Sequence, residues 1–262
     1  MKDNSFISLP EKEFLPFLEE TIAVSGNIGD GFPVMVAYNV PCFVLKNLWP
    51  ARYNDLLQKP QRMSFAIAET GWRGKAANIQ SILKLDEGRA VVEFSKSYVI
   101  DCEALLVAVK CDDDLALVNL TAHAAGQTWQ SRNENDICFT TSKGQVIDHF
   151  KVSGSIIIPG GEYQLVKPRD YARLAIQIPR REFTGLAAMA LGIMKFHGVY
   201  GEDELLASLR ETIFSSRKES KIQKNAVVAA AAIIDELFKR VAAEKLHPFW
   251  PRALKMKQMM SK

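Results

Sequence analysis

The spacing of apolar residues changes twice along this chain of 262 residues, and this change limits what the chain can fold into. From about residue 9 to 62, and again from about 168 to 262, apolar side chains recur at the intervals of a helix. Between about 63 and 166, short apolar runs with β-branched residues alternate with Asp and Gly turns. The sequence therefore predicts helices, then strands, then helices, which is an α+β order.

The N-terminal region predicts helices that are separated by breaks. Residues 11–20 carry phenylalanine and leucine at helical spacing. Residues 26–33 are rich in glycine and end in proline, so we expect a loop there. Residues 40–58 return to helical spacing, and Pro50 interrupts them.

The central region predicts an antiparallel β-barrel or sandwich. Turns such as residues 86–88 separate its apolar runs, and many short strands at this spacing are typical of those two architectures. The expected strands lie within residues 64–68, 77–83, 90–94, 104–109, 115–120, 137–141, 146–152 and 155–158.

The C-terminal region predicts a helical bundle. Pro179 stands where a first helix would begin, and that helix would continue to about His197. Further helices are expected at residues 202–214 and 222–246, and the last has one apolar stripe that needs a partner helix. The expected domains are an N-terminal helical region (1–62), a central β domain (63–166) and a C-terminal helical domain (167–262).

Composition and charge exclude several classes of protein. Apolar residues make up 48% and charged residues 24% of the chain, as in soluble globular proteins. The formal net charge of +3 is too nearly balanced to indicate binding to nucleic acid. We find no secretory signal and no run that is long enough to span a membrane. We therefore expect a cytoplasmic protein without a membrane span.

The potential metal ligands are dispersed along the chain. Cys42, Cys102, Cys111 and Cys138 form no CxxC pair, and the four histidines are equally scattered. A zinc site or a disulfide framework would need tighter grouping. We expect reduced cysteines and no metal.

Two segments near the middle of the chain resemble acyl-CoA dehydrogenases. Residues 68–81, AETGWRGKAANIQS, are similar to the TEPGAGSD segment of that family and the strand after it, with Glu69 in register. Residues 88–100 are similar to the DG..YVLNG.K.WIT hairpin of the family, where Lys96 matches and Tyr98 takes the aromatic position.

A third segment extends the resemblance into the C-terminal region. Residues 181–192, REFTGLAAMALG, are similar to the first helix of the C-terminal domain of the family, with Glu182 in register. The three segments occur in the order and spacing of the family. The resemblance covers about residues 40 to 245 and implies the fold of the acyl-CoA dehydrogenases.

The resemblance also implies a chemistry and a catalytic base. In the family a carboxylate removes the α-proton of an acyl thioester, and FAD accepts the β-hydride. Glu182 matches the position that carries this base in some relatives. The alternative role of Glu182 is structural, because a carboxylate in the first turn of a helix interacts favourably with the helix dipole.

The resemblance places six residues at the FAD cofactor, namely Ala68, Glu69, Gly74, Tyr98, Val99 and Ile100. Ala68, Gly74 and Ile100 stand where the family has hydroxylated side chains. Main-chain N–H groups could replace those contacts, since they do not depend on the side chain. Tyr98 could stack on the flavin ring, or it could be an ordinary strand aromatic that faces the core.

Three functions therefore remain open at the level of the sequence. The first is flavin-dependent α,β-dehydrogenation of an acyl-CoA or carrier-protein thioester, with Glu182 as the base, in a homo- or hetero-oligomer. The second is a non-catalytic or heteromeric partner subunit that keeps the fold but has lost much of the flavin site. The third is an enzyme that uses the same acyl slot for hydration or dehydration.

Overall fold

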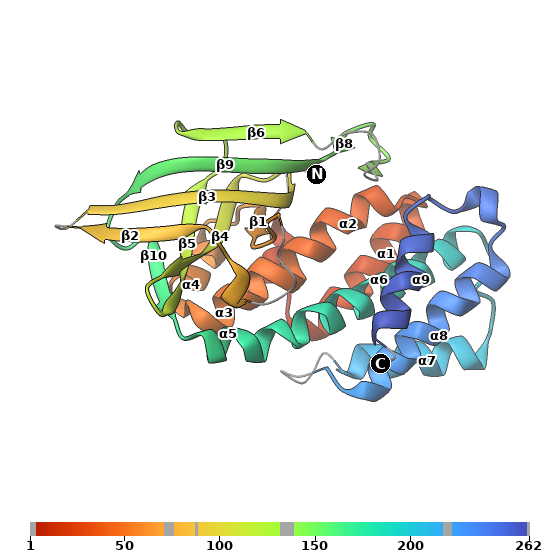
Figure 1. The fold of residues 1–262 in the computed structure, drawn as a ribbon. Coiled ribbons are helices and arrows are strands. Elements are labelled where there is room, and N and C mark those ends of the chain that lie inside the picture. The colour runs from red at the N-terminus through yellow and green to blue at the C-terminus, as the bar shows by residue number, and fades with distance from the viewer. Residues whose placement is uncertain (1–3, 71–75, 87–88, 132–138, 217–221, 261–262) are drawn as a thin grey trace. The chain divides into compact units, whose positions relative to one another are not determined.

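The computed structural model describes residues 4–70, 76–86, 89–131, 139–216 and 222–260 (Figure 1). The chain divides into two compact units, and each is built from segments that are far apart in sequence. The unit that we call the sheet unit contains Met1–Ile7, Val40–Cys138 and Ile147–Ala175. The unit that we call the helical unit contains Ser8–Asn39, Phe139–Val146 and Ile176–Lys262. The division into three domains, 1–62, 63–166 and 167–262, remains a prediction from the sequence.

The elements follow the expected order of helices, strands and helices. The helices are α1 (Glu11–Ser25), α2 (Ile28–Ala37), α3 (Phe43–Leu48), α4 (Pro50–Gln58), α5 (Pro168–Ala175), α6 (Gln177–Phe196), α7 (Glu204–Ser215), α8 (Lys224–Arg240) and α9 (Trp250–Met260). The strands are β1 (Met63–Ala66), β2 (Ile82–Asp86), β3 (Arg89–Ile100), β4 (Ala104–Cys111), β5 (Asp114–Thr121), β6 (Gln127–Ser131), β7 (Phe139–Thr140), β8 (Val146–Ile147), β9 (His149–Ile158) and β10 (Tyr163–Val166).

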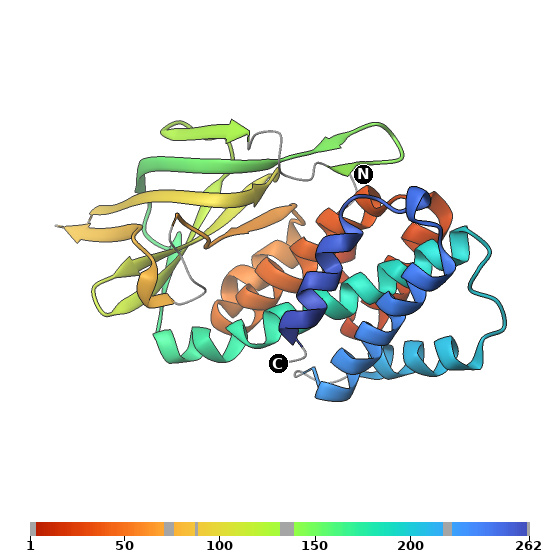
Figure 2. The same cartoon turned by 45° about the vertical axis from the view of Figure 1, so that its right-hand side comes forward.

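The main sheet is open and mixed, so the expected closed antiparallel barrel is not formed. Its strands run in the order β10-β5-β4-β2-β3-β9-β6, and β7 and β8 form a separate pair. Most neighbours are antiparallel, but β1 and β2 both pair with β4 in parallel. Strands β4 and β5 are buried along nearly their whole length, which is the pattern of strands covered on both faces. Figure 2 shows β6, β9 and β3 side by side at one end of this sheet.

Residues 28–33 form the start of helix α2, so our prediction of a loop over residues 26–33 was wrong except at Gly26 and Asn27, which form the turn between α1 and α2. The Asn27 side chain caps the helix by accepting a hydrogen bond from the N–H of Gly29, at 2.8 Å. A Cβ atom at Gly29 would lie 2.4 Å from the carbonyl oxygen of Thr140. A Cβ atom at Gly31 would lie 2.8 Å from the side chain of Ile22. These glycines therefore allow close packing of a helix, and they do not mark a turn.

Helix α2, a π-helical turn at Tyr38–Cys42 and helix α3 follow one another without a break. Among the described residues, Ile28–Leu48 is long and apolar enough to cross a membrane by length and composition, with a mean hydropathy of 1.4. This corrects the expectation that no run reaches that length. Its burial within the protein, 78%, is that of a core helix.

Helix α6 is the central helix of the helical unit. Every residue from Phe183 to Met194 is buried, as expected of a helix that is apolar on all sides. It packs against α1 and α8, and α7 runs beside α8 (Figures 1 and 2). A Cβ atom at Gly192 would lie 2.5 Å from the carbonyl oxygen of Glu19 in α1, so the two helices touch through main-chain atoms.

Ion pairs also join α1 to its neighbours. The carboxylate of Glu19, 1% exposed, forms an ion pair with Lys195 of α6 and accepts a hydrogen bond from Arg210 of α7 at 2.7 Å. The guanidinium of Arg181, also 1% exposed, donates to the carboxylate of Glu11 at 2.7 Å. Buried charges are tolerated because each has a partner of opposite sign.

We predict that Gly192→Ala destabilises the protein by about 1–3 kcal/mol, since the added methyl group forces α1 and α6 apart. Urea unfolding of the purified variant measures this change. Gly160→Ala is the matched control, because a Cβ atom there meets nothing within 4 Å. It should change the free energy of unfolding by less than about 0.5 kcal/mol. Equal stabilities of the two variants would contradict the close packing at Gly192.

Candidate functional site

The expected cofactor residues of the sheet unit come from two neighbouring stretches of chain. The carbonyl of Ala68, just after β1, accepts a hydrogen bond from the N–H of Ser97 at 2.7 Å. The N–H of Ile100 donates to the hydroxyl of Ser64 in β1 at 3.3 Å. The structure therefore brings Ala68 and Glu69 beside residues 96–100. Gly74 lies outside the described residues.

Tyr98 stands out from β3 because the strand is irregular at this point. The register of β3 against β9 shifts between Lys96 and Val99, which marks a bulge. Tyr98 has φ 61°, a left-handed backbone conformation that is strained for this residue type, and its side chain is 55% exposed. The exposed ring excludes the alternative of a core-facing aromatic.

Val99 and Ile100 differ from Tyr98 in their burial. Val99 is fully buried in the apolar core of the sheet unit, and Ile100 is also buried. Their side chains contribute to packing. At these positions only main-chain groups could contact a ligand.

Glu69 forms a buried ion pair with Lys96, which the sequence analysis did not predict. The Lys96 ammonium donates to Oε1 of Glu69 and to the carbonyl oxygen of Ala108, the second at 2.5 Å. The Glu69 carboxylate also accepts from the N–H groups of Gln80 at 2.6 Å and Ser81 at 3.2 Å. Lys96 has no exposed surface. Glu69 and Lys96 each match a position of the family, so the sequence marked both residues. It did not show that they contact each other.

The pKa values of this pair follow from burial and mutual attraction. Burial lowers the pKa of Lys96 to about 8, against the opposing effect of Glu69. Burial raises the pKa of Glu69, but hydrogen bonds from Lys96, Ser81 and Gln80 outweigh it and hold the pKa below 4.5. Through these bonds Glu69 fastens the loop after β1 to β3.

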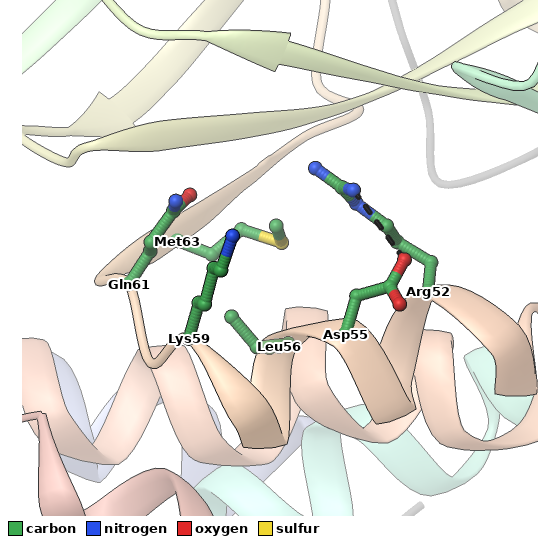
Figure 3. A pocket seen from close by; sticks show the side chains of 6 residues that line it. All are labelled: Arg52, Asp55, Leu56, Lys59, Gln61 and Met63. Atoms are coloured by element: carbon green, nitrogen blue, oxygen red, sulfur yellow. Dashed lines mark ion pairs between the residues drawn. The ribbon is translucent and has the colours of Figure 1, made fainter.

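A small hollow in the sheet unit lies between α4 and β1. Figure 3 shows the polar ends of Arg52, Lys59 and Gln61 around the apolar side chains of Leu56 and Met63. Its volume is about 70 Å³, well below the usual range for an organic ligand. Arg52 lies 3.6 Å from the carboxylate of Asp55 and 3.8 Å from that of Glu162. The positive charge of Arg52 is therefore compensated, and we assign no function to this hollow.

Glu182 lies in the helical unit, in the second turn of α6. The helix begins at Gln177, so the expectation that Glu182 occupies the first turn was wrong by one turn. The residue is half-buried, and burial raises the pKa of its carboxyl group to about 7. A helix dipole would have lowered the pKa instead.

No neighbour neutralises Glu182. Within the part of the chain that the structure describes, its carboxylate forms no ion pair and accepts no hydrogen bond. The adjacent Arg181 is paired with Glu11. A carboxyl group with a pKa near 7 and without a structural partner can act as a general base at neutral pH.

Metal-binding chemistry finds no support in the described residues. They contain no group of three or more His, Cys, Asp or Glu side chains that could hold a metal ion. Cys42, Cys102 and Cys111 are buried cysteines, and Cys138 is not among the described residues. Burial, followed by the charge of Asp101, raises the pKa of Cys102 to about 12. Such a thiol is unreactive at neutral pH.

Comparison with known proteins shows the fold of the chain. No protein-family model and no curated protein matches the sequence. Among solved structures, glutaryl-CoA dehydrogenase from Mycobacterium smegmatis in complex with FADH2 is similar, with a TM-score of 0.60, 12% identity and coverage of 100% of this chain and 77% of that one. PigA with FAD and proline has a TM-score of 0.65, 11% identity and coverage of 95% and 77%.

Podospora anserina nitroalkane oxidase has a TM-score of 0.64, 12% identity and coverage of 98% of this chain and 83% of that one. The chain therefore has an acyl-CoA dehydrogenase-like fold, as the resemblance of residues 68–81, 88–100 and 181–192 predicted. At this level of identity the likeness concerns the fold alone.

We predict that Glu69→Gln destabilises the protein by about 3–5 kcal/mol, because it leaves the buried Lys96 ammonium without a counter-charge. The double variant Glu69→Gln/Lys96→Met removes that charge as well, so it should lose clearly less stability than Glu69→Gln alone. Urea unfolding of the two single variants and the double variant completes the cycle.

The exposed pair Lys84–Glu93 of the same sheet, at 2.7 Å, is the matched control, and Glu93→Gln should cost less than about 1 kcal/mol. Additive losses at Glu69 and Lys96 would show that the pair is not coupled.

Proposed function

We propose that this protein is an acyl-CoA dehydrogenase-like enzyme that removes the α-proton of an acyl thioester through Glu182. The observation that supports this proposal best is the half-buried Glu182 carboxyl group, whose pKa burial raises to about 7. The substrate would be an acyl-CoA or a carrier-protein thioester. We further propose a cytoplasmic protein that works as a homo- or hetero-oligomer.

The fold supports FAD as the cofactor of this reaction. Two similar structures contain FADH2 or FAD by their descriptions, namely glutaryl-CoA dehydrogenase and PigA. FAD, when bound, would supply an acceptor for the β-hydride of the substrate.

The residues of the sheet unit fit a flavin through an aromatic face and main-chain groups. The exposed ring of Tyr98 offers a surface for stacking. Ala68, Val99 and Ile100 provide no polar side chain, so a flavin here would be held by fewer hydrogen bonds than in relatives that have hydroxyls. Gly74 has no side chain, so it could contribute only main-chain groups. Glu69 would act indirectly, by holding the Ala68 carbonyl beside β3 through its bond to Lys96.

Glu182 would act as the base by its own chemistry. Above a pH of about 7 its carboxylate is ionised and can accept a proton from the α-carbon. Its burial keeps the charge poorly solvated, and this makes the carboxylate a stronger base than an exposed glutamate. Arg181 does not weaken it, because its own charge is matched by Glu11.

A second candidate function is a partner subunit that keeps the fold without flavin chemistry. The observation that favours it is the lack of hydroxyl side chains at Ala68, Gly74 and Ile100. Such a subunit would bind another chain and would contribute no redox step. The two candidates differ in whether the isolated chain binds FAD.

We predict that the purified protein binds added FAD. The visible absorption spectrum of FAD should then change to that of a protein-bound flavin. Tyr98→Phe should retain this binding, because it keeps the ring. Tyr98→Ala should weaken it about tenfold. If no flavin co-purifies and none binds at high concentration, the dehydrogenase function is excluded for the isolated chain, and the partner-subunit candidate takes its place.

We predict that acyl-CoA bleaches the flavin spectrum anaerobically, and that Glu182→Gln lowers this rate at least about 100-fold without changing FAD affinity. The wild-type rate should rise with pH and level off above about 7, since only the ionised carboxylate accepts a proton. Glu211→Gln, an exposed residue of the same unit, is the control. An unchanged rate in Glu182→Gln would remove Glu182 from the role of base.

A further inference from the structure

The helical unit contains a second hollow, of about 500 Å³, which the proposed dehydrogenation does not use. The turn between α1 and α2, strand β7, the end of α6 and residues 245–250 form its walls. Phe196, at its rim, lies 14 residues beyond Glu182 on the same helix, which is roughly 21 Å along the axis. Its size falls in the usual range for small organic ligands.

The charge of this hollow favours an anion. Lys245 and His247 line it, and none of its described lining residues is acidic. Among the described residues, Lys245 is exposed and forms no ion pair, so its ammonium group is available. Asp30 stands in the first turn of α2 close by, but one of its oxygens accepts from the N–H of Ser142 at 3.1 Å. Because Asp30 offsets the dipole of α2, the preference for an anion rests on the basic side chains.

The shape and lining favour a flat aromatic group. The ring of Phe196 is 48% exposed at the rim. Gly26 leaves room for the ring, since a Cβ atom at that position would lie 2.5 Å from it. Trp250, with no exposed surface, also lines the hollow.

The imidazole of His247 is fixed in orientation. It stacks on Phe139 with ring centroids 5.2 Å apart, and its Nδ1 accepts from the N–H of Phe249 at 3.2 Å. The hollow thus presents preorganised aromatic rings and one available cation, which is how flat organic acids are recognised.

We propose that this hollow is a binding site for an aromatic carboxylate. The ring of the ligand would lie against Phe196 and His247, and its carboxylate would pair with Lys245. This site is separate from that of Glu182, so it can be tested whether or not the protein is a dehydrogenase.

The test is isothermal titration calorimetry of the full chain with 2-naphthoate and with its neutral analogue 2-naphthalenemethanol. We expect 2-naphthoate to bind about 3- to 10-fold more tightly. Lys245→Gln should abolish the difference between the two compounds, because it removes the cation. Phe196→Leu, which keeps the apolar volume, should weaken both compounds because it removes the flat face.

Lys224→Gln is the matched control, since it removes an exposed lysine of the same unit that does not line the hollow. It should bind both compounds as the wild type does. Thermal unfolding verifies that each variant is folded. The proposal is overturned if 2-naphthoate does not bind saturably, or if Lys245→Gln and Lys224→Gln retain the same preference for the anion.

Discussion

The burial of α6 on all sides is the constraint on which the helical unit depends. Every residue from Phe183 to Met194 is buried, and at Gly192 the helix meets the main chain of α1 directly. A helix packed this closely cannot rotate or slide without breaking its contacts. Glu182, just before the buried stretch, and Phe196, just after it, are therefore held in fixed positions. Both proposed sites of the helical unit depend on this one packing arrangement.

The sheet unit depends on a different interaction, the ion pair between Glu69 and Lys96. Taking two charges out of water is costly, and the pair offsets this cost through hydrogen bonds to Gln80, Ser81 and Ala108. The pair joins the chain after β1 to β3 just before the bulge that exposes Tyr98. The buried ion pair thus anchors the strand next to Tyr98, an exposed aromatic residue with a strained backbone. Strained residues of this kind cluster at ligand sites.

The sequence was informative where one pattern decides one structure. The hydrophobic period identified helices and strands, and the motif remnants identified the fold, because both depend on neighbouring residues. Prediction from the sequence failed where tertiary packing determines the local structure. Gly29 and Gly31 lie within a helix and not in a loop, and the strands β4 and β5 belong to an open sheet. The pairing of Glu69 with Lys96 and the solvation of Glu182 depend on residues brought together by folding, so no local pattern contains them.

The raised pKa of Glu182 has a cost in stability. Between pH 4.5 and about 7 the folded protein keeps a proton that the unfolded chain loses, so the carboxyl group lowers stability progressively as the pH rises through this range. We propose a functional role for Glu182, because its carboxyl group costs stability at neutral pH and has no partner among the described residues. The most direct test is an NMR titration of ¹³C-labelled glutamate carboxyl groups, with Glu182→Gln to assign the resonance. A midpoint near 7 for Glu182 is the predicted result, and a midpoint near the ordinary 4.5 would contradict its role as a poised base.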